Sequence, residues 1–275
     1  MKTSLSMDLQ GHVAVVTGAA NGLGEGSAMA LARCGADVVI ADKDVDNGER
    51  VAEKIRTLGQ KAVFVPADMM VAESIDNLCT QVKEKFGFVN VLVNNVGGGR
   101  PQNFITQSKN SIQRHINLNF MSVLLTTQMI VPMMVEQGKG GTIINVASTE
   151  ALRAAPGFAV YAACKAAVVN FTKTMALELA ADGIRSFALA PDMIKTPGLS
   201  PLMNTATPEQ AAARDRYIPN GRVGSIEEFG QVVAFLASDM ASYLNGVTIP
   251  VDAGATAAAG WYRNIENEWC LYHAS

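Results

Sequence analysis

Residues 13–24 read Val-Ala-Val-Val-Thr-Gly-Ala-Ala-Asn-Gly-Leu-Gly, an apolar run that leads directly into three closely spaced glycines. The run His12–Thr17 has the β-branched character of a strand buried on both faces, and Leu23–Cys34 has the pattern of a helix. Glycines between a strand and a helix permit a tight turn and let backbone N–H groups approach a phosphate. A glycine cluster alone is a weak signal, but this context predicts a strand–turn–helix unit that binds a dinucleotide.

The rest of the chain repeats this alternation of apolar runs and helical patterns. Further strands are expected at Asp37–Asp42, Lys61–Pro66, Val89–Asn94, Thr142–Ala147, Arg185–Ala190 and Thr248–Val251. Further helices are expected at Asp46–Leu58, Ser74–Phe86, Asn110–Gln137, Phe158–Ala181 and Ile226–Ser238. This order predicts an α/β fold, a Rossmann-type doubly wound sandwich with about seven parallel strands and helices on both faces. No linker divides residues 1–275, so we expect a single dinucleotide-binding and catalytic domain.

Two regions do not follow the pattern. Residues 191–222 form a long segment with prolines and apolar side chains, which favours a lid over a substrate site. Residues 255–275 form a tail that is rich in aromatic side chains. This tail is expected to pack on the body or on a neighbouring subunit, or else to be a partly ordered terminus.

Composition and charge exclude several classes of function. The net charge of −3 argues against a nucleic-acid surface or a polybasic membrane anchor. The four cysteines include no Cys-x-x-Cys pair and the three histidines have no metal-ligand spacing, so no metal site is expected. No apolar stretch looks long enough for a signal segment or a membrane span. We therefore expect a cytoplasmic protein with reduced thiols and a small-molecule substrate.

Asp42 stands 18 residues after Gly24, at the end of the second expected strand. A carboxylate there accepts hydrogen bonds from the adenosine ribose hydroxyls of a dinucleotide and repels a 2′-phosphate. The sequence therefore favours NAD over NADP. Lys43 follows directly and could weaken that preference, although its side chain is expected to point to solvent.

Other polar or special residues stand where further strands end. Asp68 follows the third strand, Asn94-Asn95-Val96-Gly97 the fourth, Ser148 the fifth and Pro191 the sixth. Ligands of open α/β sheets bind outside the carboxyl ends of the strands. Because all these residues fall on that one edge, the edge is predicted to hold the functional site.

Tyr161 and Lys165 are four residues apart in an expected helix, so their side chains share one face. A tyrosine that acts as a base near neutrality needs its pKa lowered from about 10, by roughly 4 kcal/mol. A cation about 4 Å away at an effective dielectric near 20 supplies about that much. Such pairs are also common on helix surfaces. Ser148 could orient a substrate oxygen beside the phenol, although a serine at a strand end is otherwise an ordinary cap.

Together, these motifs resemble the short-chain dehydrogenase/reductase family. The resemblance extends from about Asp8 to Gly254 and rests on Thr17-Gly18-x-x-x-Gly22-x-Gly24, Asn94-Asn95-x-Gly97, Asn119, Ser148 and Tyr161-x-x-x-Lys165. It implies that Tyr161 is the general acid and base, and that Lys165 lowers the pKa of Tyr161 and binds the nicotinamide ribose. It also implies that Ser148 steadies the reacting oxygen and that Asn119 holds a water of a proton relay.

The resemblance further implies which residues bind the cofactor. They are Gly18, Asn21, Gly22, Leu23, Gly24, Asp42, Asp68, Met69, Asn95, Gly97, Tyr161, Lys165, Pro191, Ile194 and Thr196. Asn21 stands where NADP-dependent members often carry a basic residue, which again favours NAD. Val96 and Asp192 depart from the family pattern, which usually has alanine and glycine there, and Asp192 is expected to alter the loop beside the nicotinamide.

The substrate is less well defined by the sequence. Glu150, Phe158 and Met193 are expected to line its pocket, with Glu150 either receiving a polar group of the substrate or remaining an exposed loop carboxylate. The apolar side chains of residues 191–222 indicate a hydrophobic alcohol or ketone, cyclic or steroid-like. The expected activity is therefore NAD-dependent hydride transfer to or from a secondary alcohol or ketone.

Three other readings are open to the same fold. A catalytically idle NAD-binding sensor or scaffold is one, but it has no need of Tyr161 or Lys165. The enoyl-thioester reductases of the family space their tyrosine and lysine more widely than here. A sugar-nucleotide epimerase is a third reading, but it needs an added substrate domain for which this chain has no room. The family typically forms homotetramers through two long helices, so a homotetramer or homodimer is expected.

Overall fold

The computed structural model describes residues 6–271 and places seven strands in one parallel sheet of order β3-β2-β1-β4-β5-β6-β7. The strands are β1 (Val13–Thr17), β2 (Asp37–Asp42), β3 (Ala62–Pro66), β4 (Val91–Asn94), β5 (Gly141–Val146), β6 (Ile184–Pro191) and β7 (Thr248–Val251). All of their ends lie within two residues of the predicted ones. The predicted doubly wound sandwich is therefore confirmed, and its strand order reverses between β1 and β4.

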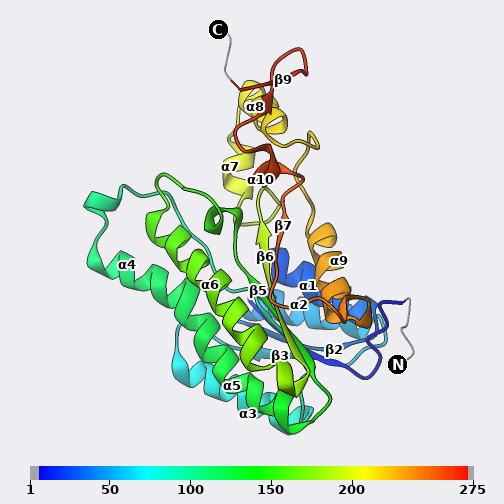
Figure 1. Cartoon of the computed structure of the whole chain (residues 1–275). Helices are drawn as coiled ribbons and strands as arrows, with labels where there is room; N and C mark the ends of the chain where they lie inside the picture. Colours follow the sequence, from blue (N-terminus) through cyan, green and yellow to red (C-terminus); the bar gives the residue numbers. More distant parts are fainter. Residues whose placement is uncertain (1–5, 272–275) are drawn as a thin grey trace.

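Helices cover both faces of the sheet (Figure 1). One layer contains α1 (Gly22–Arg33), α2 (Val45–Arg56) and α9 (Ile226–Ala237), and the other contains α3 (Ala72–Lys85), α5 (Ser122–Glu136) and α6 (Ala159–Glu178). The side chains of β1 alternate between the two layers, with Ala14 and Val16 on the α1 side and Val15 on the α3 side. All three are fully buried, which explains why the strand reads as a continuous apolar run.

The helix predicted at Asn110–Gln137 is divided in the structure. It consists of α4 (Lys109–Ile116), a π-helical turn (Asn117–Met121) and α5. By length and composition alone, the run Lys109–Glu136 could cross a membrane, with a mean hydropathy of 1.6 in its most apolar window. The expectation that no apolar stretch is long enough for a membrane span is therefore wrong for this run. The run packs against α3 and α6, as a core helix does, and 44% of that window is buried.

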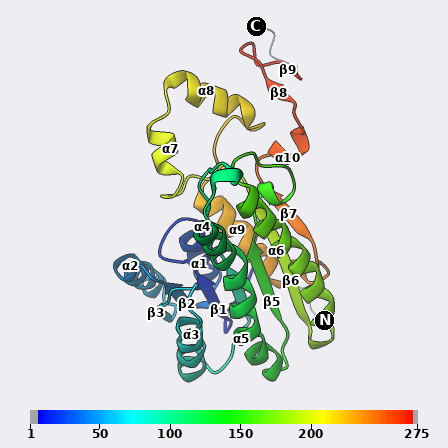
Figure 2. The same cartoon turned by 90° about the vertical axis from the view of Figure 1, so that its left-hand side faces the viewer.

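The segment predicted as a lid contains two helices, α7 (Ser200–Asn204) and α8 (Pro208–Tyr217), so it is an ordered helical segment and not a loop. A capping box formed by Thr207 and Gln210 starts α8. The tail contains α10 (Ala255–Ala258) and a small hairpin of β8 (Tyr262–Arg263) and β9 (Trp269–Cys270). Both segments lie beyond the carboxyl ends of the strands (Figure 2), and α8 contacts β8. Residues 272–275 of the predicted tail lie outside the described residues.

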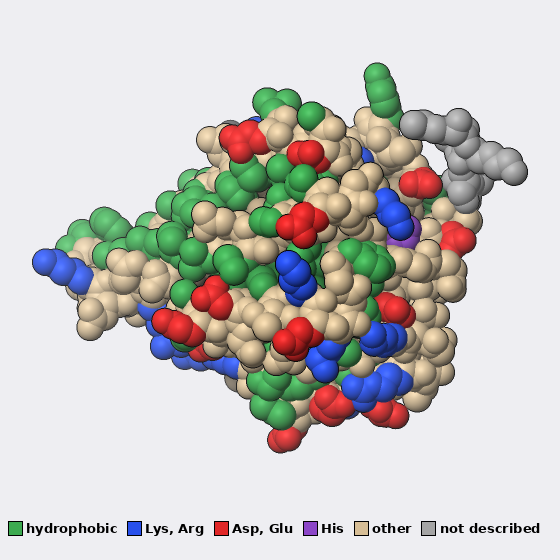
Figure 3. All heavy atoms as spheres, turned by 90° about the horizontal axis from the view of Figure 1, so that it is seen from below, with side chains coloured by type: hydrophobic (Ala, Val, Ile, Leu, Met, Phe, Trp, Pro, Cys, Tyr) green, Lys and Arg blue, Asp and Glu red, His purple; other side chains and the backbone are tan. Residues whose placement is uncertain are grey.

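The charged side chains do not form a field of one sign on the face shown in Figure 3. Lysine and arginine side chains are intermixed there with aspartate and glutamate. This pattern agrees with the small net charge of −3 and offers no basic surface for nucleic acid on that face. Among residues 6–271, no group of three or more histidine, cysteine, aspartate or glutamate side chains could hold a metal ion.

Two glycines let α1 and α9 approach closely. A Cβ added at Gly230 would lie 2.2 Å from the carbonyl oxygen of Gly26, and one added at Gly26 would lie 2.2 Å from that of Ile226. Both obstacles are backbone atoms, which cannot rotate away. The contact between these helices therefore depends on the missing side chains.

Because of this contact, we expect a glycine-to-alanine change at Gly230 to destabilise the protein, whereas the same change usually stabilises a helix. In an ordinary helix, Gly→Ala stabilises by up to about 1 kcal/mol. For Gly230→Ala we expect the free energy of unfolding to fall by about 2 kcal/mol, because the methyl group forces the helices apart. Urea unfolding checks this value, with the exposed neighbour Gln231→Ala as the control. A Gly230→Ala protein as stable as the parent would contradict the close contact.

Candidate active site

The glycine turn after β1 is shaped to receive a phosphate. Gly18 and Gly22 have φ angles of +63° and +57°, which favour glycine. A Cβ at Gly24 would lie 2.1 Å from the carbonyl oxygen of Gly18, so the start of α1 lies directly against the turn. The N-cap residue of α1, Asn21, makes no side-chain cap hydrogen bond. The first backbone N–H groups of α1 thus remain available for an anion.

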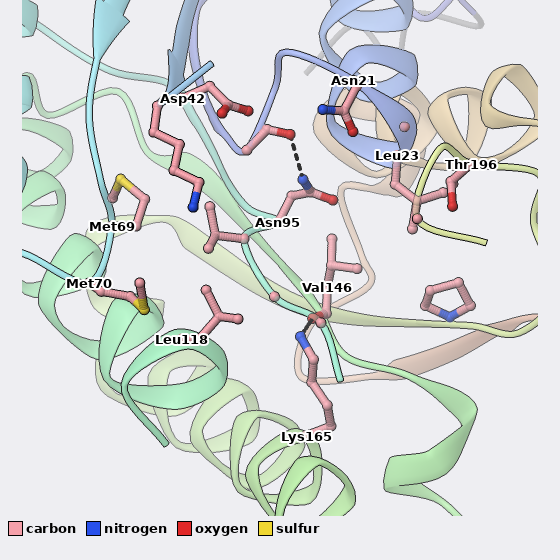
Figure 4. A pocket seen from close by; sticks show the side chains of 18 of the residues that line it. Asn21, Leu23, Asp42, Met69, Met70, Asn95, Leu118, Val146, Lys165 and Thr196 are labelled. Atoms are coloured by element: carbon pink, nitrogen blue, oxygen red, sulfur yellow. Dashed lines mark hydrogen bonds between the residues drawn. The ribbon is translucent and has the colours of Figure 1, made fainter. Parts of the chain in front are cut away.

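A cleft of about 430 Å³ opens from this turn along the carboxyl ends of the strands (Figure 4). Most of the predicted cofactor residues line it, namely Gly18, Asn21, Gly22, Leu23, Asp42, Asp68, Met69, Asn95, Gly97, Tyr161, Lys165, Pro191 and Thr196. The sequence did not single out other lining residues, among them Met70, Leu118, Val146 and Gly198. The cleft is large enough for part of a dinucleotide, and its shape fits the group that the sequence implies.

Two predicted cofactor residues do not line the cleft. Gly24 lies beneath the turn, where it allows the close packing of α1. Ile194 is 5% exposed and packs into the core on the α1 side. It also forms a bridge with Gly224 and lines a separate cavity of about 180 Å³. Its side chain therefore does not face the cleft, and its expected contact with the nicotinamide stays a prediction.

Asn95 joins the ends of β1 and β4. Its Nδ2 donates to the carbonyl oxygens of Thr17 and Gly18, both at 3.0 Å, and its backbone N–H donates to Thr17 Oγ1 at 3.0 Å. Figure 4 shows this side chain in the middle of the cleft. The amide therefore holds the glycine turn in place at the point where the strand order reverses.

Asp42 lies at one side of the cleft, at the end of β2. Its Oδ2 accepts a hydrogen bond from the Ala20 N–H at 2.9 Å, and its Oδ1 accepts one from the Asp44 N–H at 3.0 Å. Each oxygen keeps a further lone pair for a ribose hydroxyl. Lys43 also lines the cleft, and it is exposed to solvent as expected. A carboxylate and an ammonium group thus stand together at this side of the cleft.

Lys165 is a buried cation at the floor of the cleft. It is 2% exposed, and its Nζ donates to the Val146 carbonyl oxygen at 2.7 Å. Burial lowers the pKa of this ammonium group to about 8. A Cβ at Gly97 would lie 2.7 Å from Nζ, so glycine at that position leaves room for the ammonium group.

Tyr161 and Ser148 meet beside Lys165. The two hydroxyls are hydrogen-bonded to each other, and Lys165 Nζ lies 5.9 Å from the centre of the Tyr161 ring. The i, i+4 spacing predicts a lowered pKa for Tyr161, but burial raises it, and the negative charge of Glu150 adds to that rise. The hydrogen bond from Ser148 acts in the opposite direction. In this state Lys165 is directed at a carbonyl oxygen and not at the phenol.

Asn119 lies in the π-helical turn and is fully buried. Its Oδ1 accepts from the Gly98 N–H at 2.8 Å, and its Nδ2 donates to the carbonyl oxygens of Gly98 and His115, both at 3.0 Å. The side chain thus ties the segment after β4 to the helix. These three hydrogen bonds are all to backbone groups, and the role that the resemblance implies for Asn119 stays a prediction.

None of the three predicted substrate residues lines the cofactor cleft itself. Phe158 packs edge-to-face on Tyr161, with ring centres 6.1 Å apart. Met193 lines the same separate cavity as Ile194. Glu150 is not a free loop carboxylate, because its Oε1 accepts from Arg153 at 2.9 Å.

Arg153 is the centre of a network that the sequence did not reveal. It donates to the Tyr217 hydroxyl at 2.6 Å and lies 3.5 Å from Asp192 Oδ2. Tyr217 in turn donates to Asp192 at 2.9 Å. The network joins α8 to the segment after β5 and the segment after β6. Burial raises the pKa of Asp192, which stands where the family usually has glycine.

Comparisons with known proteins agree with this geometry. A family model described as enoyl-(acyl carrier protein) reductase matches residues 18–256. The chain is 38% identical to the 3-oxoacyl-[acyl-carrier-protein] reductase of Thermotoga maritima, over 90% of this chain and 99% of that protein. It is 37% identical to 3beta-hydroxysteroid dehydrogenase 1 of Eggerthella lenta, over 92% of this chain and 97% of that protein.

Solved structures resemble the whole sheet and its helices. A short-chain type dehydrogenase/reductase from Mycobacterium marinum is 34% identical with a TM-score of 0.85, covering 91% of this chain and 97% of that one. A 7 alpha-hydroxysteroid dehydrogenase complexed with NADH and 7-oxo glycochenodeoxycholic acid is 31% identical with a TM-score of 0.84, covering 90% and 96%. A putative 2-deoxy-D-gluconate 3-dehydrogenase from Agrobacterium tumefaciens with bound NADP is 29% identical with a TM-score of 0.84, covering 92% and 100%.

The buried ammonium group predicts a pH-dependent stability. Between about pH 8 and pH 10.5, the folded protein releases the Lys165 proton while the unfolded chain keeps it, so stability rises with pH. Below about pH 8 Lys165 stays charged in the folded protein, so burial of the ammonium group lowers the stability by its full amount. We expect the parent protein to gain roughly 3 kcal/mol relative to Lys165→Met from neutral pH to the end of that range.

Urea unfolding of the ligand-free protein at a series of pH values measures this difference. Lys173→Met, which removes an exposed lysine from the same helix, controls for general alkaline effects. A stability difference between parent and Lys165→Met that does not change with pH would show that Lys165 is not a desolvated cation.

Proposed function

Since the chain belongs to the short-chain dehydrogenase/reductase family, we propose that this oxidoreductase transfers a hydride between NAD(H) and a secondary alcohol or ketone. The observation that carries the proposal is the meeting of Tyr161 and Lys165, which line the cleft, with Ser148 beside them. The family membership supports the oxidoreductase activity, and the site supports the reaction type.

In this proposal each side chain has one role. Ser148 donates a hydrogen bond to the substrate oxygen and holds it near the phenol. Tyr161 Oη gives a proton to that oxygen during ketone reduction and takes it back during alcohol oxidation. Lys165 supplies positive charge beneath the phenol, which favours the phenolate form. A nicotinamide, when bound, supplies or accepts the hydride.

Two features support NAD as the cofactor. Asp42 presents a carboxylate at the side of the cleft, where it repels a 2′-phosphate. Asn21 lines the cleft at the position where the resemblance associates a basic residue with NADP. Lys43 is the opposing feature, because its ammonium group also lines the cleft.

The alternatives are less well supported. A buried ammonium group carries a cost in folding free energy, and an idle sensor has no use for it. The description of the matching family model names an enoyl reductase, but the four-residue spacing of Tyr161 and Lys165 favours alcohol and ketone chemistry within the family. Two similar proteins are named as hydroxysteroid dehydrogenases, which supports a hydrophobic, cyclic substrate.

We also propose that the chain forms a homodimer or homotetramer through its long helices. Met129 and Val135 on α5 and Leu177 on α6 are apolar and exposed by 38%, 38% and 81%. A second copy that packs on these helices would remove this apolar surface from water. The mass in solution, measured by light scattering, tests the assembly.

Replacing the phenol tests the proposed reaction. Purified protein is assayed with NAD⁺ and NADP⁺ against a panel of secondary alcohols that includes cyclic and steroid compounds, and reduced nicotinamide is followed by absorbance. We expect turnover with NAD⁺, and we expect Tyr161→Phe to lower kcat at least about a hundredfold because the proton donor and acceptor is lost.

Tyr243→Phe makes the same chemical change at a fully exposed tyrosine and is expected to leave kcat unchanged. Turnover that survives in Tyr161→Phe would remove Tyr161 from the mechanism. Cofactor binding by the parent with no turnover in either direction would favour the idle sensor.

Removing the Asp42 charge tests the cofactor. Asp42→Asn is expected to raise kcat/KM for NADP⁺ relative to NAD⁺ about tenfold, because the repulsion of the 2′-phosphate disappears. The same ratio should not change in Asp46→Asn, which alters an exposed carboxylate on α2. A parent enzyme that already prefers NADP⁺ would overturn the assignment of NAD.

A further inference from the structure

A second large cavity lies between the lid helix α8 and the tail, and we call it the tail cavity. Its volume is about 640 Å³, and its walls include Leu152, Arg153, Arg216, Tyr217, Trp261 and Tyr262. It shares no lining residue with the cofactor cleft. The volume lies within the range of small-molecule sites in proteins.

The tail cavity depends on a part of the chain that the family match does not cover. The family model ends at residue 256, whereas residues 258–262 form one wall of the cavity. Those residues include a tryptophan and a tyrosine, and α8 forms the opposite wall. This wall of the cavity is therefore formed by residues beyond the part of the chain that the family model matches.

The wall toward the active site is formed by Arg153 and Tyr217. The Arg153 guanidinium is already engaged by Glu150, Asp192 and the Tyr217 hydroxyl. Two carboxylates thus neutralise its positive charge, and it has little charge left for a ligand in the cavity.

Arg216 differs from the other arginines of this region. Within residues 6–271, no carboxylate or hydrogen-bond acceptor is paired with it, whereas its neighbour Arg214 pairs with Asp215 at 2.7 Å. The remaining walls are mostly apolar, from Leu152, the alanines of α10 and Trp261. The cavity therefore combines an apolar interior with one uncompensated cation.

We propose that the tail cavity binds a molecule with an apolar body and a carboxylate group, with the carboxylate paired to Arg216. The apolar body packs between Trp261 and Leu152, and a guanidinium binds a carboxylate through charge-assisted hydrogen bonds. Because Tyr217 connects the cavity wall to Asp192 beside the cofactor cleft, a bound ligand also holds the lid helix against the active site.

The chain offers its own reporter for this site. It has two tryptophans, of which Trp261 lines the cavity while Trp269 stacks on Arg263 in the hairpin. In the full-length Trp269→Phe protein, Trp261 fluorescence is titrated with decanoate and with decanol, which share an apolar chain and differ in charge. We expect a saturable change with decanoate and binding at least fivefold weaker for decanol.

Substitution of Arg216 then tests whether its positive charge, and not only the shape of the cavity, contributes to decanoate binding. In the same background, Arg216→Gln should weaken decanoate binding about tenfold and leave decanol binding unchanged, because one charged pair is lost. Arg216→Lys keeps the charge and should restore most of the affinity. Arg214→Gln, a change to the paired neighbour, should have no effect.

Three outcomes would overturn the proposal: no saturable response to decanoate, equal affinity for decanoate and decanol, or Arg216→Gln binding like the parent. The titration requires neither cofactor nor turnover. A negative titration would therefore leave the proposed oxidoreductase function intact. Turnover that survives in Tyr161→Phe would likewise leave the proposal for the tail cavity intact.

Discussion

The hydrogen bonds of the Asn95 amide to the carbonyl oxygens of Thr17 and Gly18 hold together the part of the fold on which the site depends. They fix the glycine turn against the end of β4, where the strand order reverses. The start of α1 then points its free N–H groups into the cleft, with Asp42 on one side and Lys165 on the floor.

The ionisable side chains of the site, Tyr161 and Lys165, are both largely removed from water. Burial raises the pKa of Tyr161 and lowers that of Lys165, so both groups favour their neutral forms more than they would in solvent. The Lys165 ammonium group is held by a backbone carbonyl oxygen, and the phenol by the Ser148 hydroxyl. The structure thus places the proposed proton donor, Tyr161, beside the buried cation of Lys165.

Much of this arrangement follows from sequence periodicity. Continuous apolar strands such as His12–Thr17 predict a parallel sheet, and the polar residues at their ends predict the edge along which the cleft lies. The helix spacing of Tyr161 and Lys165 correctly predicts their common face, but not that Lys165 Nζ points to Val146. That direction depends on the packing of α6 against β5, which local sequence does not encode.

The lid and the tail were the least predictable parts. Arg153 and Tyr217 are 64 residues apart, and their contact exists only because α8 folds back over the strand ends. The π-helical turn at Asn119 and the tail cavity likewise come from tertiary packing. Periodicity is a local signal, so it finds strands and helices more readily than contacts between distant segments.

An isotope experiment tests whether the proposed hydride passes directly from the alcohol carbon to the nicotinamide. Secondary alcohols from the cyclic and steroid panel, each deuterated at the carbinol carbon, are incubated with the protein and NAD⁺, and the reduced cofactor is examined by NMR. Deuterium at C4 of the nicotinamide is the predicted result. Reduced cofactor without deuterium at C4, or bound NAD⁺ that no alcohol reduces, would contradict the account.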